Sequence, residues 1–200
     1  YSSEDMYRQI ESYIVDNFGE KGNFRFVIAP DDTPYACTCA TCTALGNTEK
    51  NATPAVTELL LRLSQRFPKH TFFTTSYLTT QQVTDKQLPP NVGVIVSAID
   101  YPLRRTDGKD EQDKKFAEQL DNWKKVTNNI YIWDYINNFD DYLTLMPILK
   151  IARQRLQFFK QHGASGIFFN GSGYSYSSFD EMRTFVLSAL LINPELSVDN

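Results

Sequence analysis

Apolar residues recur at helical spacing in five segments of the chain, and polar or Gly- and Pro-containing stretches separate them. A repeat of three to four residues places these side chains on one face, which is typical of an amphipathic helix packed against a core. The pattern therefore predicts five helices, over residues 6–18, 56–67, 116–123, 148–159 and 182–190.

Capping residues fix where several of these helices begin. Ser2 or Ser3 is placed to cap the first helix, and Thr53 stands in the capping position before the second. The last helix is predicted to start at Ser178, with Glu181 three residues later completing a capping box.

Short runs rich in β-branched and aromatic residues lie between the helices and predict strands. Each run is bounded by Gly, Pro, Asp or Asn, as expected where a strand enters a turn. The predicted strands are residues 24–29, 71–77, 92–99, 130–136 and 167–169.

Strands and helices alternate along the chain, except in the polar connection between the second and third strands. Alternation of this kind predicts parallel strands joined by right-handed crossovers. A complete eight-fold barrel takes about 250 residues, so five units predict an incomplete parallel (β/α) barrel. We expect residues 1–200 to form one barrel-like domain, the C-terminal part of a larger barrel, and an open doubly wound parallel sheet is the alternative.

Composition narrows the possible partners. The 200 residues are 42% hydrophobic and 22% charged, which fits an ordinary globular fold. The net charge is -4, and no Lys/Arg run is long enough to follow a phosphate backbone, so we expect no nucleic-acid partner. No apolar stretch approaches the about 20 residues that a membrane helix needs.

Aspartate, asparagine and aromatic residues gather at the ends of the predicted strands. In parallel architectures the ligand site lies at the carboxyl ends of the strands. Flat rings suit the apolar faces of a sugar, and carboxylates accept its hydroxyl hydrogen bonds or exchange protons with it. Turn-forming and partly buried side chains are the alternative explanation for each one. The candidates are Asp32 and Asp134 as catalytic carboxylates, and Tyr77, Tyr101, Trp133, Tyr135, Asn170 and Tyr174 as substrate-binding residues.

Asp134 is the most informative candidate because it lies inside a predicted strand. Period-two alternation puts it on one face with Ile132 and Ile136, and puts Trp133 and Tyr135 on the other. A buried, unpaired carboxylate is costly, so we expect Asp134 to face the barrel mouth. A salt bridge to a basic residue of a neighbouring element is the alternative.

Three cysteines, Cys37, Cys39 and Cys42, form a C-x-C-x-x-C motif in the loop after the first strand. Three states are possible for them. They supply most of a tetrahedral zinc site, they form one disulfide and leave one free thiol, or all three remain reduced. Disulfide geometry favours a bond from Cys37 or Cys39 to Cys42. A nucleophilic role is not expected, because both histidines lie at the opposite ends of the strands.

A set of motifs in a fixed order resembles one bacterial family, called domain of unknown function 4838. They are Ala-Pro-Asp-Asp before the cysteines, Leu-Pro-Pro-Asn-Val (88–92), Tyr-Ile-Trp-Asp-Tyr (131–135), Phe-Phe-Lys (158–160), Gly-Ile-Phe-Phe (166–169) and Asn-Pro (193–194). The resemblance implies a carbohydrate-active barrel, exported to the periplasm or cell surface, often beside an α-glucuronidase-type N-terminal domain. The family pattern falls on Asp32, Trp133, Asp134, Tyr135 and the three cysteines.

Two functions follow as hypotheses. The first is a glycoside hydrolase-like barrel that uses Asp32 and Asp134, and the second is a non-catalytic glycan-binding or interaction module of a glycan-uptake system. A hydrolase needs two carboxylates about 5 to 10 Å apart in one cavity, whereas a binding module needs only the aromatic platform. The resemblance implies that the position after Gly-Ile-Phe-Phe is often Gln or Glu in the family. This chain has Asn170 there, so a catalytic acid at that position would be missing.

Overall fold

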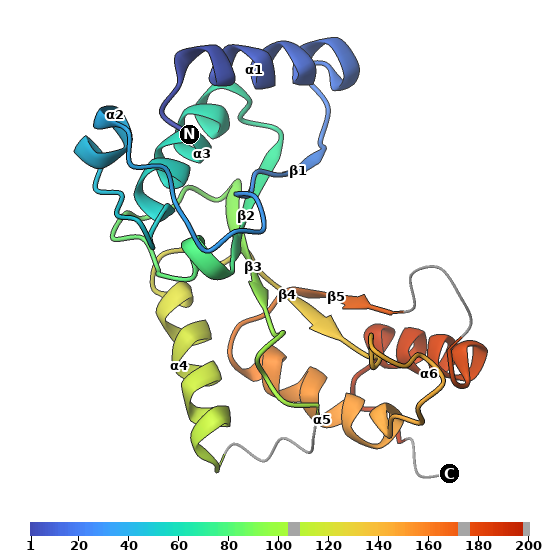
Figure 1. Ribbon diagram of the computed structural model, residues 1–200. Coiled ribbons are helices and arrows are strands. Elements are labelled where there is room, and N and C mark those ends of the chain that lie inside the picture. The colour runs from blue at the N-terminus through green and yellow to red at the C-terminus, as the bar shows by residue number, and fades with distance from the viewer. Residues whose placement is uncertain (104–108, 172–176, 198–200) are drawn as a thin grey trace. The chain divides into compact units, whose positions relative to one another are not determined.

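The computed structural model describes residues 1–103, 109–171 and 177–197 (Figure 1). Within these ranges the chain alternates between helices and short strands, with a 3₁₀ turn, η1, in one connection. The elements are α1 (Glu4–Phe18), β1 (Arg25–Val27), α2 (Ala40–Ala44), α3 (Thr53–Arg66), β2 (Thr71–Ser76), η1 (Leu78–Thr80), β3 (Val92–Ser97), α4 (Glu111–Lys124), β4 (Ile130–Tyr135), α5 (Ile148–Gln161), β5 (Gly166–Asn170) and α6 (Asp180–Ile192).

The five strands follow one another in the sheet in the order β1-β2-β3-β4-β5. All neighbours are parallel, and the register pairs Phe26 with Phe72 and Phe73 with Gly93. A doubly wound sheet reverses its strand order at a switch point, whereas a barrel keeps adding strands in one direction. The observed order confirms the prediction of an α/β fold with an incomplete parallel barrel.

All five predicted strands and all five predicted helices are present. The connection between β2 and β3 lacks an α-helix, as predicted, and contains η1 instead. The short helix α2 in the cysteine loop was not predicted from the sequence. Five residues are too few to show a helical period, so no repeat could reveal it. Among the described helices, none is long and apolar enough to cross a membrane.

Two of the predicted caps are wrong. In both cases the hydroxyl of the predicted capping residue donates to a backbone carbonyl outside the helix. Ser3 does cap α1 by accepting a bond from the backbone N–H of Met6. At α3, however, Asn51 Oδ1 accepts from the Thr53 backbone N–H, and Thr53 Oγ1 donates to the Gln82 carbonyl. The N-cap of this helix is therefore not supplied by the Thr53 side chain.

At α6 the capping box is replaced by another arrangement. The residue before the helix is Phe179 in a left-handed conformation, with φ of 55° and no side-chain cap bond. Ser178 does not cap the helix, because its hydroxyl donates to the carbonyl of Leu143. Asp180, the first helical residue, accepts from the Ser177 backbone N–H instead.

The described chain divides into two compact units. Unit 1 comprises residues 1–96 and 122–131, and its core forms between α1, α3, β2 and β3. Helix α3 supplies most of this core through Val56, Leu59, Leu60 and Leu63, and Phe72 of β2 packs against them. The predicted apolar stripe of α3 is thus the face that the unit buries.

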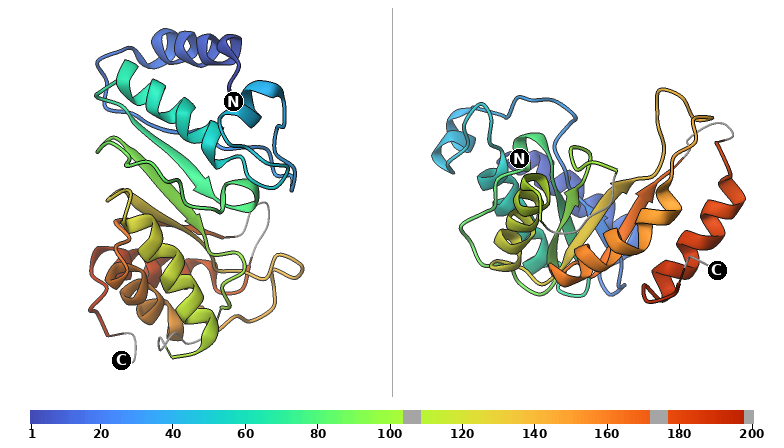
Figure 2. Two further views of the ribbon diagram at one scale, coloured as in Figure 1. Left: turned by 90° about the vertical axis from the view of Figure 1, so that its left-hand side faces the viewer. Right: turned by 90° about the horizontal axis from the view of Figure 1, so that it is seen from below.

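Unit 2 comprises residues 97–121 and 132–200, and its core lies between the last two helices and β5. Helices α5 and α6 pack side by side (Figure 2). Ala152 and Leu156 of α5 meet Leu187 and Leu190 of α6, and Phe169 packs against this cluster. Burial of these apolar side chains positions both helices beside the strands.

Gly93 on β3 leads to a prediction about the sheet. A Cβ at this position would lie 2.6 Å from Phe73 Cε1 and 2.6 Å from Asn129 Cβ, and would also meet the Asn129 carbonyl oxygen. Overpacking of this kind costs about 1–3 kcal/mol. Gly93→Ala should lower the free energy of unfolding by this amount in urea titrations. Gly171→Ala is the control, because its nearest neighbour would be at an ordinary 3.6 Å; equal losses would contradict the steric explanation.

Candidate functional site

A pocket lies in unit 2 at the carboxyl ends of β3 and β4. Its volume is about 420 Å³, within the about 300–1,000 Å³ that ligand sites occupy. One wall is the segment after β3, residues 98–103, and the other consists of the end of β4 and the residues after it. The second wall contributes Asp134, Tyr135, Asn137 and Phe139. We call this cavity the β3–β4 pocket.

Arg155 on α5 holds the two walls of the pocket together. Its Nε and NH2 atoms donate to the two carboxylate oxygens of Asp134 at 2.9 and 2.6 Å. Its NH1 atom donates to the Pro102 carbonyl at 2.7 Å. Both side chains of the ion pair are almost completely buried, at 0% and 1% exposure. One guanidinium thus links α5 to the end of β4 and to the segment after β3.

Tyr101 belongs to the same buried network. Its ring lies 4.6 Å from the Arg155 guanidinium carbon and stacks on Phe116 with an interplanar angle of 4°. Its hydroxyl donates to Asp113 Oδ1 at 2.6 Å. These contacts bury all but 5% of Tyr101, so the side chain supports the pocket wall.

The network changes the interpretation of two predicted site residues. Asp134 was expected at the barrel mouth, and of the two alternatives the structure shows the salt bridge. Asp134 borders the pocket, but Arg155 engages both carboxylate oxygens, which does not favour a proton-transfer role. Tyr101 was expected to cover a sugar, and its ring is instead packed between Arg155 and Phe116.

A signal for the salt bridge was present in the sequence. Arg155 stands three residues after Ala152 and four before Phe159, on the apolar stripe of α5. A charged residue on a core-facing stripe needs a buried partner. Asp134, inside the preceding strand, is the partner of opposite charge. A cation on an apolar helix stripe and a carboxylate in a buried strand together predict the pair.

The opposite face of β4 carries the aromatic residues. Burial alternates along the strand, with Ile132 and Asp134 buried and Trp133 and Tyr135 only partly buried. The Trp133 and Tyr135 rings are nearly parallel, with centroids 6.4 Å apart. Phe139 meets Tyr135 edge to face at 5.8 Å and is 41% exposed. Tyr135 and Phe139 therefore bring accessible ring surface to the β3–β4 pocket.

Asp32, Tyr77 and Asn170 are not among the described residues that line this pocket. Asp32 is exposed in the loop after β1 of unit 1, and Tyr77 precedes η1 in the same unit. Asn170 ends β5, where its carbonyl accepts from the Ile136 backbone N–H at 3.1 Å. Tyr174 lies outside the described residues.

One residue of the pocket wall, Asn137, is not among the candidates predicted from the sequence. Asn137 lines the pocket and is only 5% exposed, although it follows the strand in a segment that reads as an ordinary turn. Its side-chain amide oxygen Oδ1 accepts from Arg183 of α6, 46 residues away. A contact over that separation has no signature in a single sequence.

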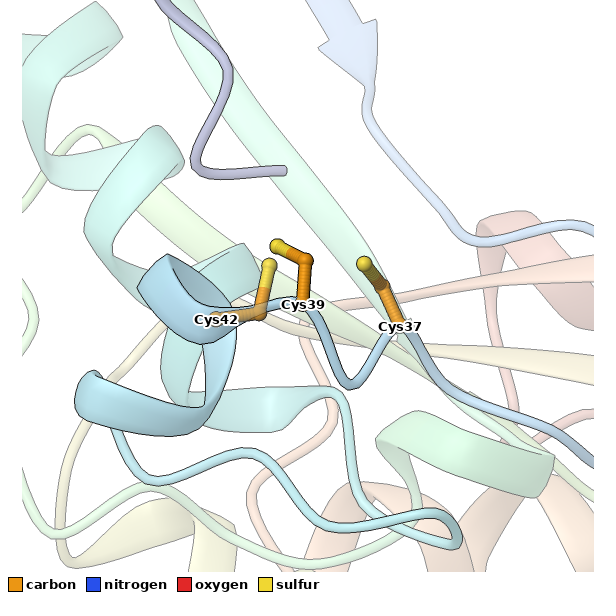
Figure 3. Close-up of side chains that lie close together, drawn as sticks. All are labelled: Cys37, Cys39 and Cys42. Atoms are coloured by element: carbon orange, nitrogen blue, oxygen red, sulfur yellow. The ribbon is translucent and has the colours of Figure 1, made fainter.

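The three cysteines form a second candidate site, in unit 1. Their sulfur atoms all lie within 4.8 Å of one another, and they project to the same side of the loop (Figure 3). All three are free thiols, and Cys42 is buried while the other two are exposed. The Ser2 hydroxyl lies 3.1 Å from the Cys42 sulfur. We call these residues the thiol cluster, which could hold a metal ion.

Hydrogen bonding separates the acidities of the thiols. The pKa of Cys39 is lowered to about 6 by hydrogen bonds to its sulfur. The Cys42 backbone N–H has the largest effect, and the Cys37 thiol has the next largest. For Cys37, the backbone N–H of Cys39 lowers the pKa, but hydrogen bonds to the Cys39 and Cys42 sulfurs outweigh it and the pKa is raised. The lowered pKa of Cys39 favours its thiolate, which is the form that binds metals.

The chain matches a protein-family model over almost its whole length. The model of the family described as Domain of unknown function (DUF4838) covers residues 2–200. The search of curated proteins finds no match.

The buried ion pair predicts a large difference between two arginines of the same helix. Arg155→Met leaves Asp134 buried without its partner, which should lower the free energy of unfolding by about 3–5 kcal/mol. Arg153→Met removes a 3.9 Å contact with Glu195, which is 63% exposed, and a 3.4 Å hydrogen bond to the Pro194 carbonyl. It should cost about 1 kcal/mol. Urea unfolding followed by circular dichroism measures both.

Replacing both partners provides a further check on the ion pair. Asp134→Leu combined with Arg155→Met leaves no unpaired charge and should recover much of the loss. Equal effects of the two single arginine variants would show that the ion pair has no special role.

Proposed function

Because the chain belongs to the DUF4838 family, whose description assigns no activity, we propose that its β3–β4 pocket binds carbohydrate. The supporting observation is the pocket itself, at the strand ends where parallel barrels place ligands. The Tyr135 and Phe139 rings offer apolar faces for the C–H groups of a sugar ring, and the exposed Asp100 offers a carboxylate to its hydroxyls.

We propose binding in preference to hydrolysis. Glycoside hydrolysis uses two carboxyl groups with separate roles in proton transfer and attack. Among the described residues that line the pocket, the carboxylates are Asp100 and Asp134. Asp134 is held on both oxygens by Arg155, and this pair would have to break before Asp134 exchanged a proton. The geometry thus supports a glycan-binding module.

Substitution of the aromatic wall tests this proposal. Isothermal titration calorimetry with the methyl glycosides of glucose, galactose, mannose, xylose and glucuronic acid identifies the best-bound sugar. Tyr135→Ala removes a ring face and should weaken that binding at least about tenfold, or about 1.4 kcal/mol. Tyr13→Ala, which removes a 59% exposed ring of α1, should leave it unchanged.

Two results would contradict the binding proposal. One is the absence of measurable affinity for every glycoside of the panel. The other is release of reducing sugar from aryl glycosides or oligosaccharides by the wild-type chain at a rate that Asp134→Asn abolishes, which would favour the hydrolase.

We further propose that the thiol cluster holds one zinc ion. Zinc with Zn–S bonds of about 2.3 Å keeps its sulfur ligands about 3.8 Å apart in a tetrahedron. Sulfur atoms within 4.8 Å of one another need only small side-chain rotations to reach that geometry. Such an ion would tie the loop after β1 to the short helix α2. Its role would be structural.

Metal analysis distinguishes the three states of the cysteines. We expect one zinc per chain by inductively coupled plasma mass spectrometry, and a lower melting temperature after chelation, because bound metal stabilises the folded state. Cys42→Ser should lose the zinc and the response to chelator, while Thr41→Ser keeps both. A zinc-free chain that is 2 Da lighter than its reduced mass would indicate a disulfide, and three titratable thiols without metal would indicate reduced cysteines.

A further inference from the structure

We infer that Asn137 binds the ligand of the β3–β4 pocket by donating a hydrogen bond from its side-chain amide. This inference rests on the proposed carbohydrate binding and adds to it a specific donor residue. Asn137 lines the pocket and is 95% buried, so its amide is held in place and not free in solvent.

Arg183 determines the orientation of the Asn137 amide. The Arg183 NH1 atom donates both to Asn137 Oδ1 and, at 3.0 Å, to the Ile136 carbonyl. A guanidinium group has five donors and no acceptor. The amide oxygen must therefore face Arg183, and the opposite orientation would place two donors against each other. The amide nitrogen consequently points away from Arg183.

Arg183 is itself fixed at the start of α6. Its NH2 atom donates to Asp180 Oδ1 at 2.8 Å and to the Ser177 hydroxyl, and only 5% of the residue is exposed. Asp180 also accepts from the Ser177 backbone N–H at 3.2 Å. The orientation of Asn137 is thus set before any ligand arrives, which lowers the entropy lost on binding.

The Asn137 amide nitrogen is buried and has no hydrogen-bond partner within the described part of the chain. A buried donor without an acceptor destabilises a protein, and an acceptor arriving with a ligand removes that cost. A sugar hydroxyl can accept from Asn137 and donate to a carboxylate such as Asp100, which lines the same pocket. The combination of one donor, one carboxylate and ring faces matches the groups of a pyranose.

An isosteric substitution isolates the donor. Asn137→Asp keeps an oxygen for Arg183 and replaces the amide nitrogen by a second acceptor, with almost no change in volume. We expect its affinity for the best-bound methyl glycoside to fall at least about tenfold, with an unchanged circular dichroism spectrum. Asn138→Asp makes the same charge change at the next residue, which does not line the pocket, and should bind as the wild type does.

The results separate this inference from the proposed function. If the wild-type chain binds a glycoside and folded Asn137→Asp binds it equally well, the assignment of Asn137 is wrong and carbohydrate binding stands. If the wild type binds none of the panel, both are wrong. Should Asn137→Asp fail to fold, the side-chain NH₂ resonances of Asn137 in the wild type decide: they shift when the glycoside is added if Asn137 is the donor, and no shift overturns the inference.

Discussion

The buried ion pair between Arg155 and Asp134 is the interaction on which the pocket of unit 2 depends. Arg155 uses all three of its nitrogens, two for Asp134 and one for the Pro102 carbonyl. A guanidinium suits this task because its donors are coplanar and fixed in direction, whereas the single ammonium of a lysine could not contact both walls in this way. The ring of Tyr101 then covers the cation and excludes water from it.

Along strand β4, buried side chains alternate with partly exposed ones. Its Ile130, Ile132 and Asp134 side chains are buried, and Asp134 meets α5. Trp133 and Tyr135 project from the other face and keep partial exposure. A single carboxylate on the buried face is stable only because α5 supplies a matching charge. The same alternation that pairs Asp134 with α5 leaves the Trp133 and Tyr135 side chains partly exposed.

The two candidate sites differ in how far apart in the sequence their residues lie. The thiol cluster is built from six consecutive residues, 37–42, with Ser2 alongside. The β3–β4 pocket needs contacts between segments up to 53 residues apart, such as that between Arg155 and Pro102. Changes in the cysteine loop should therefore act on one site alone, whereas changes in α5 or α6 reach the pocket through Arg155 and Arg183.

The sequence by itself determined the five strands, the five longer helices, the parallel α/β fold and the alternation along β4, because helix and strand periods are properties of neighbouring residues. It also marked the cysteines as one group through their spacing. Only the tertiary structure decided that Asp134 is paired, that Tyr101 is buried, and that Asn137 and Arg183 stand together. Each of these depends on which distant side chain supplies the partner, and the free energy of a buried polar group is set by that partner and not by its own position in the chain.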